Sequence, residues 1–221
     1  RTYYLVEALQ HTPDFPGHYA WTEYFSPHRK YGRAEVRFSH APTLDIRVEG
    51  QGMTGGRIEK PQPTKNESIR YQFSYSQSTA HPTEPLMVSY ADFAPRFSAS
   101  SFKTYAEVAK AYQDRARPKA EVTKIIKDQA IQIIGDASTT EEKVRRLYNW
   151  VARNIRYLGV YAGAGGYVPH SAERILRARY GDCKDHATLL ESLLRAVGIE
   201  SSTALINSDR AYRLPDPPSF G

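Results

Sequence analysis

Cysteine is almost absent from this sequence. Cys183 is the only one in 221 residues, so no intramolecular disulfide can form. No apolar run approaches the ~18 residues of a membrane span, so we expect no integral membrane segment within the chain. The acidic spacing of a calcium-binding loop is also missing, and we expect neither a metal nor another cofactor.

The charge is basic but dispersed. Thirty Lys and Arg stand against 24 Asp and Glu, which gives a formal net charge of +6. No long run of like charge and no zinc-finger or other nucleic-acid motif occurs. Scattered basic residues are typical of a solvated surface, so nucleic acid is not an expected partner.

The sequence starts within a strand-like stretch and stops within a proline-rich stretch. The chain starts at Arg1, without a methionine or a signal-peptide pattern, in the strand-like stretch RTYYLVEAL. It stops in the proline-rich stretch RLPDPPSFG. We therefore expect a piece of a longer protein, with the N-terminal part of its first domain missing and its second domain truncated at the C-terminus.

Residues 1–101 have the period of two that is typical of β-strands. Short alternating runs rich in Tyr, Phe and Val are separated by Pro, Gly, Asn and Asp clusters, which predicts an antiparallel β-sandwich. The predicted strands are 2–8, 20–26, 34–40, 44–50, 69–76 and 86–93. The glycine-rich stretch 49–60 lacks the Lys-Ser/Thr of a phosphate loop and is interpreted as a hairpin connection.

The period changes to about 3.6 near Phe102, which predicts a second domain over residues 102–221 and an α+β fold class overall. Helices are predicted over 104–118, 119–135, 138–158 and 171–180, and another begins at Cys183. Asp182 is the expected N-cap of that last helix, and Gly198 ends it. Residues 199–207 are predicted to form a strand.

Cys183 has two interpretations. It shares a helical stripe with Ala187, Leu190, Leu194 and Val197, which favours a small apolar residue packed in the core. Its place in the first turn favours a nucleophile instead, because a helix N-terminus stabilises a thiolate by about 0.3–1 kcal/mol. A nucleophile would also need a histidine to take its proton.

No histidine in the chain is a convincing base. His186 lies on a neighbouring face of the same helix as Cys183. His170 lies in a loop immediately before Ser171, a helix cap. The others belong to the β-rich region, where we expect strand or surface positions: His11, His18, His28, His40 and His81.

The stretch 149–207 resembles the bacterial transglutaminase-like superfamily. The resemblance covers about residues 120–221 and rests on Trp150, the run 155–157, the Gly166–Tyr167 pair, Pro169 and above all the run YGDCKD at 180–185. The β-rich first hundred residues resemble an uncharacterised domain that often precedes this module in Gram-negative bacteria. That second resemblance rests on the order and texture of the elements.

The resemblance implies a papain-like core with a Cys–His–Asp triad and Cys183 as the nucleophile. It places the histidine and the aspartate on strands beyond Gly221, so this 221-residue form is expected to be inactive. The backbone N–H of Cys183 would donate to the oxyanion, and Tyr167 is the candidate for a second donor. The implied reaction is acyl transfer, and we favour hydrolysis of peptide or amide bonds over cross-linking.

The alternative is a binding or scaffold module of the same fold that has lost its triad. Its tyrosines, 16 in the chain, would then supply contact area for a partner. In the enzyme interpretation the partner is a protein or peptide substrate. The resemblance further implies a periplasmic or secreted location, and an exposed strand edge would favour self-association.

Overall fold

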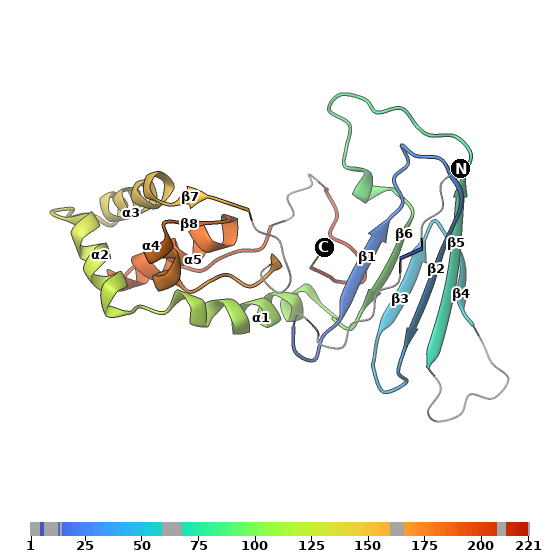
Figure 1. Ribbon diagram of the computed structural model, residues 1–221, viewed down its shortest axis with the longest axis horizontal. Coiled ribbons are helices and arrows are strands. Elements are labelled where there is room, and N and C mark those ends of the chain that lie inside the picture. The colour runs from blue at the N-terminus through green and yellow to red at the C-terminus, as the bar shows by residue number, and fades with distance from the viewer. Residues whose placement is uncertain are drawn as a thin grey trace. The chain divides into compact units, whose positions relative to one another are not determined.

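The computed structural model describes residues 5–6, 13, 15–58, 68–159, 166–206 and 211–220. Their fold is α+β, with strands in the N-terminal part and five α-helices in the C-terminal part, as the sequence predicts (Figure 1). By its internal contacts the chain divides into two compact units, Arg1–Val108 with Ile206–Gly221 and Ala109–Leu205. Within the described residues, none of the helices is long and apolar enough to cross a membrane.

The first unit contains two antiparallel sheets of three strands, in the orders β1-β6-β3 and β2-β5-β4 (Figure 1). The strands are β1 (Ala20–Tyr24), β2 (Tyr31–His40), β3 (Arg47–Gln51), β4 (Thr54–Arg57), β5 (Ile69–Gln77) and β6 (Arg96–Ser100). They confirm the strands predicted near 20–26, 34–40, 44–50 and 69–76. The strand predicted at 2–8 lies outside the described residues except for 5–6.

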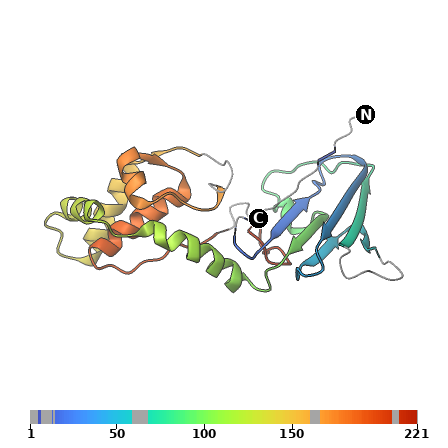
Figure 2. The ribbon, with the colours of Figure 1, turned by 60° about the horizontal axis from the view of Figure 1, so that its bottom comes forward.

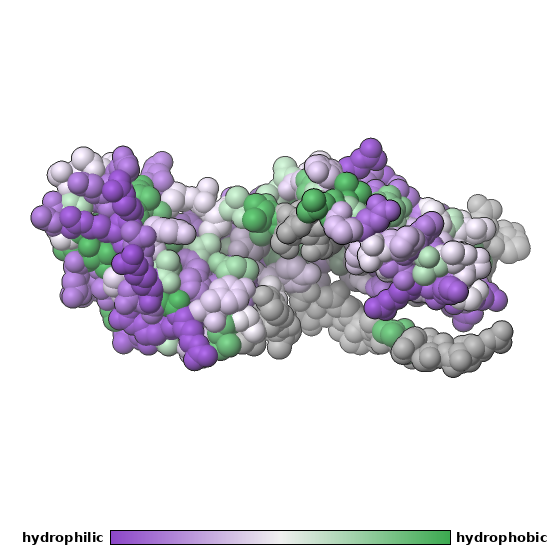
Figure 3. All heavy atoms as spheres, turned by 90° about the horizontal axis from the view of Figure 1, so that it is seen from above, coloured by the Kyte–Doolittle hydropathy of each residue, from purple (hydrophilic) through white to green (hydrophobic). Residues whose placement is uncertain are grey.

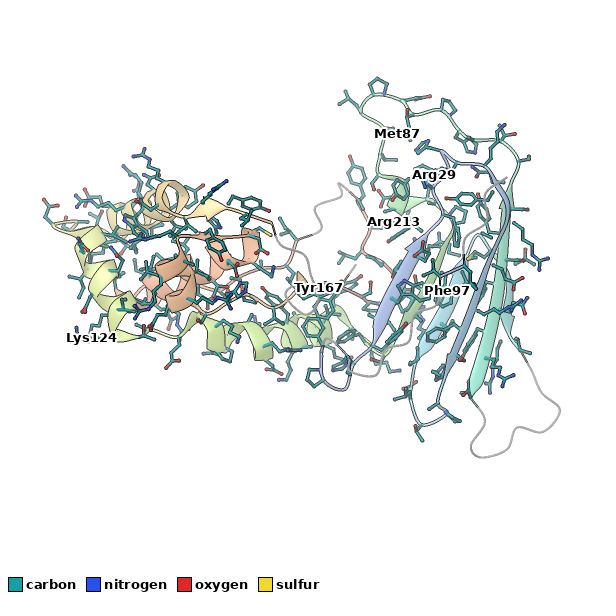
Figure 4. The ribbon with its side chains drawn as sticks, viewed as in Figure 1. Arg29, Met87, Phe97, Lys124, Tyr167 and Arg213 are labelled. Carbon is teal, nitrogen blue, oxygen red and sulfur yellow. The ribbon has the colours of Figure 1, made fainter. Side chains whose placement is uncertain are left out.

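The two sheets share one aromatic core. Phe97 in β6 is fully buried and is labelled among the strands in Figure 4. Its ring centroid lies 5.7 Å from that of Phe73 in β5 and 5.6 Å from that of Phe38 in β2. Tilted and edge-on ring pairs at such distances are favourable contacts, so residues of both sheets are held around Phe97.

The glycine-rich stretch 49–60 is not the hairpin connection that the sequence predicts. The two strands that overlap it belong to different sheets, because β3 pairs with β6 and β4 pairs with β5. A Cβ atom on Gly50 would overlap the ring of Phe73. The glycine is therefore needed where the chain crosses from one sheet to the other and the sheets approach closely.

The strand predicted at 86–93 is also wrong. These residues form a loop that contains the 3-10 turn η1 (Tyr90–Asp92), and the last strand of the unit is β6 instead. The hydroxyl of Ser89 caps the turn by accepting from the backbone N–H of Ala91 at 3.3 Å. Leu86 is 97% exposed, so its apolar character does not mark a buried strand position.

The segment 211–220 packs on the first unit. The carboxylate of Asp92 accepts the backbone N–H groups of Tyr212 and Arg213, each at 2.9 Å. Further along, the ring of Phe220 stacks on Phe15 with the centroids 3.9 Å apart. The sequence places the domain boundary at residue 101, whereas the compact units divide inside helix α1 and residues 206–221 return to the first unit.

The second unit is built around one buried helix. Helix α5 (Cys183–Ala196) packs against α2 (Lys124–Ile134), α3 (Thr140–Asn154) and α4 (Ala172–Ala178) (Figure 2). Helix α1 (Tyr105–Ala116) and the 3-10 helix η2 (Arg117–Ala120) precede them. The five predicted helices are thus confirmed, but two of them are shorter than predicted. The helix predicted at 119–135 begins at Lys124, and the one predicted at 138–158 ends at Asn154, since residues 156–157 form a strand. The core residues are almost fully buried: Ile126, Ala130, Leu147, Val151, Ile175, Leu189 and Leu193.

Two short strands join the helices of this unit. The strands β7 (Arg156–Tyr157) and β8 (Tyr180–Gly181) run parallel, and β8 leads directly into α5. The strand predicted at 199–207 is wrong for 199–206, which form no regular element, and residue 207 lies outside the described residues. A strand needs a hydrogen-bonding neighbour, and 199–206 pair with no strand in the described part of the chain.

The N-terminus of α3 offers a test of local sequence reasoning. The hydroxyl of Thr139 accepts from Glu142 N at 3.2 Å, and the Glu142 carboxylate accepts from Thr139 N at 3.3 Å. We expect Thr139→Ala to lower the free energy of unfolding of the second unit by about 1 kcal/mol in chemical denaturation. Thr140→Ala, one exposed residue later, is the control and should change it little.

The same cap has a defined pH dependence. Hydrogen bonds from the backbone N–H groups of Thr139 and Ser138 lower the pKa of Glu142. A lowered pKa stabilises the fold above the unfolded carboxyl's pKa, and this stabilisation is lost as the pH falls through the folded value. The difference in the free energy of unfolding between the parent and Glu142→Gln should therefore narrow in acid, where Glu142 becomes protonated. A constant or widening difference would contradict the assignment.

Candidate functional site

Cys183 is exposed and is the first residue of α5. A reciprocal cap holds this end of the helix. The Asp182 side chain accepts from Asp185 N at 3.3 Å, and the Asp185 carboxylate accepts from Asp182 N at 3.3 Å. The structure thus confirms the predicted first-turn position of Cys183 and places Asp182 as the N-cap.

Cys183 does not lie on the core-facing side of α5, and the core-cysteine interpretation is wrong. The buried residues of the helix are Asp185, Thr188, Leu189, Ser192, Leu193 and Leu194. Residues i and i+2 of an α-helix lie about 200° apart around the helix axis. A helix that buries Asp185 therefore turns Cys183 outward. The sequence pattern missed this because three polar residues, Asp185, Thr188 and Ser192, occupy core-facing positions.

Asp185 is the most connected residue near the thiol. Its side chain is 4% exposed, and one carboxylate oxygen accepts from His170 N at 2.8 Å. The other oxygen lies 3.1 Å from His170 Nδ1, which is therefore the protonated ring nitrogen that donates to it. Asp185 thus connects the start of α5 to the loop before α4.

Gly181 provides the space for Asp185. A Cβ atom on Gly181 would lie 2.5 Å from Asp185 Cβ and 2.9 Å from its Oδ2. Contacts this short do not occur between real side chains, so only glycine fits without a shift at this point. The glycine at 181 therefore follows from the close packing of Asp185.

Lys184 balances the charge of the N-cap. Its Nζ forms an ion pair with Asp182 Oδ2, and the two side chains are only 11% and 4% exposed. An unpaired carboxylate at this depth would be strongly unfavourable, so the ion pair offsets the cost of burying the Asp182 side chain.

His186 has both ring nitrogens engaged by backbone carbonyls. Nδ1 lies 2.8 Å from the carbonyl oxygen of Asp182, and Nε2 lies 3.1 Å from that of Ile155. The ring also lies beside Tyr157, with the centroids 5.9 Å apart. These contacts fix the start of α5 to the end of α3 and leave neither nitrogen for the thiol.

The remaining histidines belong to the first unit. His18 stacks on Phe102, and the Nδ1 atoms of His28 and His40 lie 3.0 and 2.9 Å from backbone carbonyl oxygens. His81 supplies the carbonyl oxygen that His28 contacts. His11 lies outside the described residues.

Two tyrosines of the second unit are relevant to the thiol. Tyr167, labelled in Figure 4, is 39% exposed and lies in the turn before α4, and its role as an oxyanion donor stays a prediction. Tyr112 on α1 is buried. Burial raises the pKa of its hydroxyl, and the nearby Cys183 adds to the increase. The sequence analysis missed Tyr112 because it reads as one more apolar position of the helix at 104–118.

The described residues contain no group of three or more His, Cys, Asp and Glu that could hold a metal ion. What the site offers is a thiol at the positive end of a 14-residue helix, with its own backbone N–H beside it. That arrangement suits attack on a carbonyl carbon, because the helix end stabilises both the thiolate and the developing oxyanion.

Comparison with known proteins agrees with this geometry. A family model of the transglutaminase-like superfamily matches residues 127–207, which include Cys183 and the whole of its cap. No curated protein matches the chain.

Two solved structures are similar to the chain. A candidate protease from Parabacteroides distasonis has a TM-score of 0.67 and 17% identity, over 85% of this chain and 36% of that one. A candidate cysteine protease from Cytophaga hutchinsonii has a TM-score of 0.33 and 14% identity, over 82% of this chain and 62% of that one. The first shows that the fold is shared, and this chain spans about a third of that protein.

The space at Gly181 can be tested directly. Gly181→Ala places a methyl group against Asp185, and overpacking of this kind costs typically about 1–3 kcal/mol. We expect that loss in urea denaturation, together with a changed rate of Cys183 alkylation. Gly166→Ala is the control, because a Cβ atom there meets nothing within 4 Å. Equal behaviour of the two variants would contradict the packing argument.

Proposed function

We propose that the chain carries an acyl-transfer site whose nucleophile is Cys183, because residues 127–207 match a family model of the transglutaminase-like superfamily. The observation that carries the proposal is the position of its only cysteine, exposed at the capped N-terminus of α5. A buried cysteine would have served packing alone. An exposed one at a helix N-terminus has the electrostatic setting that activates thiolates.

The reaction proceeds in two steps. The Cys183 thiolate attacks an amide carbonyl carbon, the C–S bond forms, and the oxyanion lies near the backbone N–H of Cys183. The C–N bond then breaks, and the amine leaves with a proton from the general acid, giving a thioester. Water attacks the thioester and restores the thiol in a peptidase or amidase, whereas an amine does so in a transglutaminase.

The general base is proposed to be a histidine outside residues 1–221, paired with an aspartate, as the family resemblance implies. His186 is occupied by two carbonyl oxygens. His170 is oriented by Asp185, but it does not match the catalytic histidine of the family. Tyr167 remains the proposed second oxyanion donor.

Several finer features belong to the same proposal. Hydrolysis of peptide or amide bonds is preferred to cross-linking, with a protein or peptide as substrate. The protein is proposed to be bacterial and periplasmic or secreted, and its two N-terminal sheets to form a β-sandwich. Its open strand edges would support self-association.

The second candidate function is a catalytically inactive binding module. It is favoured by the exposed tyrosines of the second unit, since aromatic side chains on a surface are typical of contact sites. Tyr148, Tyr157 and Tyr180 are 58%, 57% and 48% exposed.

The test compares the full-length protein with residues 1–221. A quenched-fluorescent peptide library measures turnover, and mass spectrometry after acid quench detects an acyl group on Cys183. We expect the full-length protein to turn over peptides, Cys183→Ala to lower kcat by at least about a thousandfold, and residues 1–221 to be inactive.

His170→Gln separates the alternatives for the base. It should leave kcat of the full-length protein within about tenfold if the base lies elsewhere, since general-base loss costs about 10²–10⁴-fold. Turnover by residues 1–221 that His170→Gln abolishes would show that the base is His170. Peptide binding without any acyl group on Cys183 would favour the binding module.

A further inference from the structure

The stretch of sequence around Cys183 is rich in basic residues. Between residues 144 and 190 the sequence has eight Lys and Arg but only three Asp and Glu. Figure 3 views the molecule from the side of α3 and β7 and shows a largely hydrophilic surface over the second unit. This stretch contributes most of the formal net charge of +6 of the chain.

All three acidic residues in this stretch are already engaged. Asp182 pairs with Lys184, Asp185 with His170, and Glu173 with Arg177. By contrast, four exposed arginines lie within ion-pair distance of no carboxylate in the described part of the chain: Arg153, Arg156, Arg174 and Arg179. Within the described residues, no ion pair therefore neutralises their charge.

Two of these arginines are connected to the short strands β7 and β8, because Arg156 begins β7 and Arg179 directly precedes β8. Arg156 begins β7, and its backbone N–H donates to the carbonyl of Arg179 at 2.8 Å. One step further, Leu158 N donates to the carbonyl of Gly181 at 2.9 Å. Arg179 lies four residues before Cys183 in the sequence, and the ladder places the backbone of Arg156 beside that of Arg179.

Arg179 occupies a position where its residue type is unfavourable. It is the C-cap of α4 with φ 61° and ψ 22°, a left-handed conformation that favours glycine. Its guanidinium lies over the Trp150 ring, 4.8 Å from the centroid, and this contact holds the charge in a fixed place. An arginine at a position where glycine would be less strained suggests that the arginine side chain has a role of its own.

We propose that Arg156 and Arg179 determine specificity by selecting peptides with an acidic side chain beside the bond that Cys183 attacks. The inference rests on the proposed function and adds the substrate class. The occupant is an acidic peptide because the surface offers unneutralised positive charge, and complementary charge raises both encounter rate and selectivity.

The positive potential that Arg156 and Arg179 are proposed to create at Cys183 can be tested on residues 1–221, without any catalytic turnover. Cys183, the sole thiol, is alkylated with iodoacetate or with neutral iodoacetamide, and the ratio of rates is compared with that of N-acetylcysteine. We expect a raised ratio at low ionic strength that falls at high salt. Arg156→Gln and Arg179→Gly should each lower it about twofold, the effect of one unit charge about 10 Å away in water.

Controls separate charge from folding. Arg145→Gln makes the same charge change on an arginine that pairs with Glu141, and it should leave the ratio unchanged. Arg179→Gly suits the left-handed backbone, so the variant should stay folded. A ratio equal to that of N-acetylcysteine, or one unaffected by either substitution, would overturn the inference.

The full-length protein then tests selectivity. Peptide pairs that differ only in Glu against Gln are compared by kcat/KM, and by fluorescence anisotropy on Cys183→Ala. We expect the Glu peptides to be preferred severalfold and the preference to be lost in Arg156→Gln. Equal turnover of both peptides would refute the inference while the proposed function stands. Absence of turnover with a retained binding preference would refute the proposed function alone.

Discussion

The second unit depends on one buried carboxylate. Asp185 closes the reciprocal cap with Asp182, accepts two hydrogen bonds from His170, and requires a glycine at 181 for space. Each contact engages a different segment: the helix N-terminus, the loop before α4 and the strand β8. A buried carboxylate is tolerated only when hydrogen-bond donors of this kind satisfy it. We therefore expect the three segments to be ordered cooperatively. The exposure of Cys183 follows, because a helix that buries Asp185 must turn residue 183 outward.

The charges around the thiol are arranged in two layers. The buried layer consists of Asp182 with Lys184 and Asp185 with His170, and each acid there has a basic partner. The outer layer consists of arginines without such partners in the described residues. The charges of the buried layer largely cancel each other. The electrostatic potential that an approaching anion experiences is therefore set by the helix N-terminus and the outer arginines. Stability and recognition are thus served by different residues of one short stretch.

Sequence reasoning succeeded where the signal is local. Helix caps, the change of period near Phe102 and the first-turn position of Cys183 are all set by neighbours within a few residues. It failed where distant contacts decide. The crossing at Gly50 depends on Phe73 in another sheet, and the loop at 86–93 is fixed in part by Asp92 binding to residues 212–213. In the site, the link from Asp185 to His170 left no pattern in the sequence, because polar core positions look like surface ones. Tyr112 was missed for a different reason, since it looks like one more apolar position of its helix.

The central claim is that Asp185 ties the loop at 166–170 to the start of α5. Amide hydrogen exchange at His170, followed by NMR, tests it most directly, because this N–H donates to the buried carboxylate. The account predicts that His170 N–H exchanges slowly in the parent protein. In Asp185→Ala it should exchange at least about tenfold faster, which is the rate change for loss of about 1.4 kcal/mol of protection. The Ile175 amide within α4 should change much less. Equally fast exchange at His170 in both proteins would contradict the account.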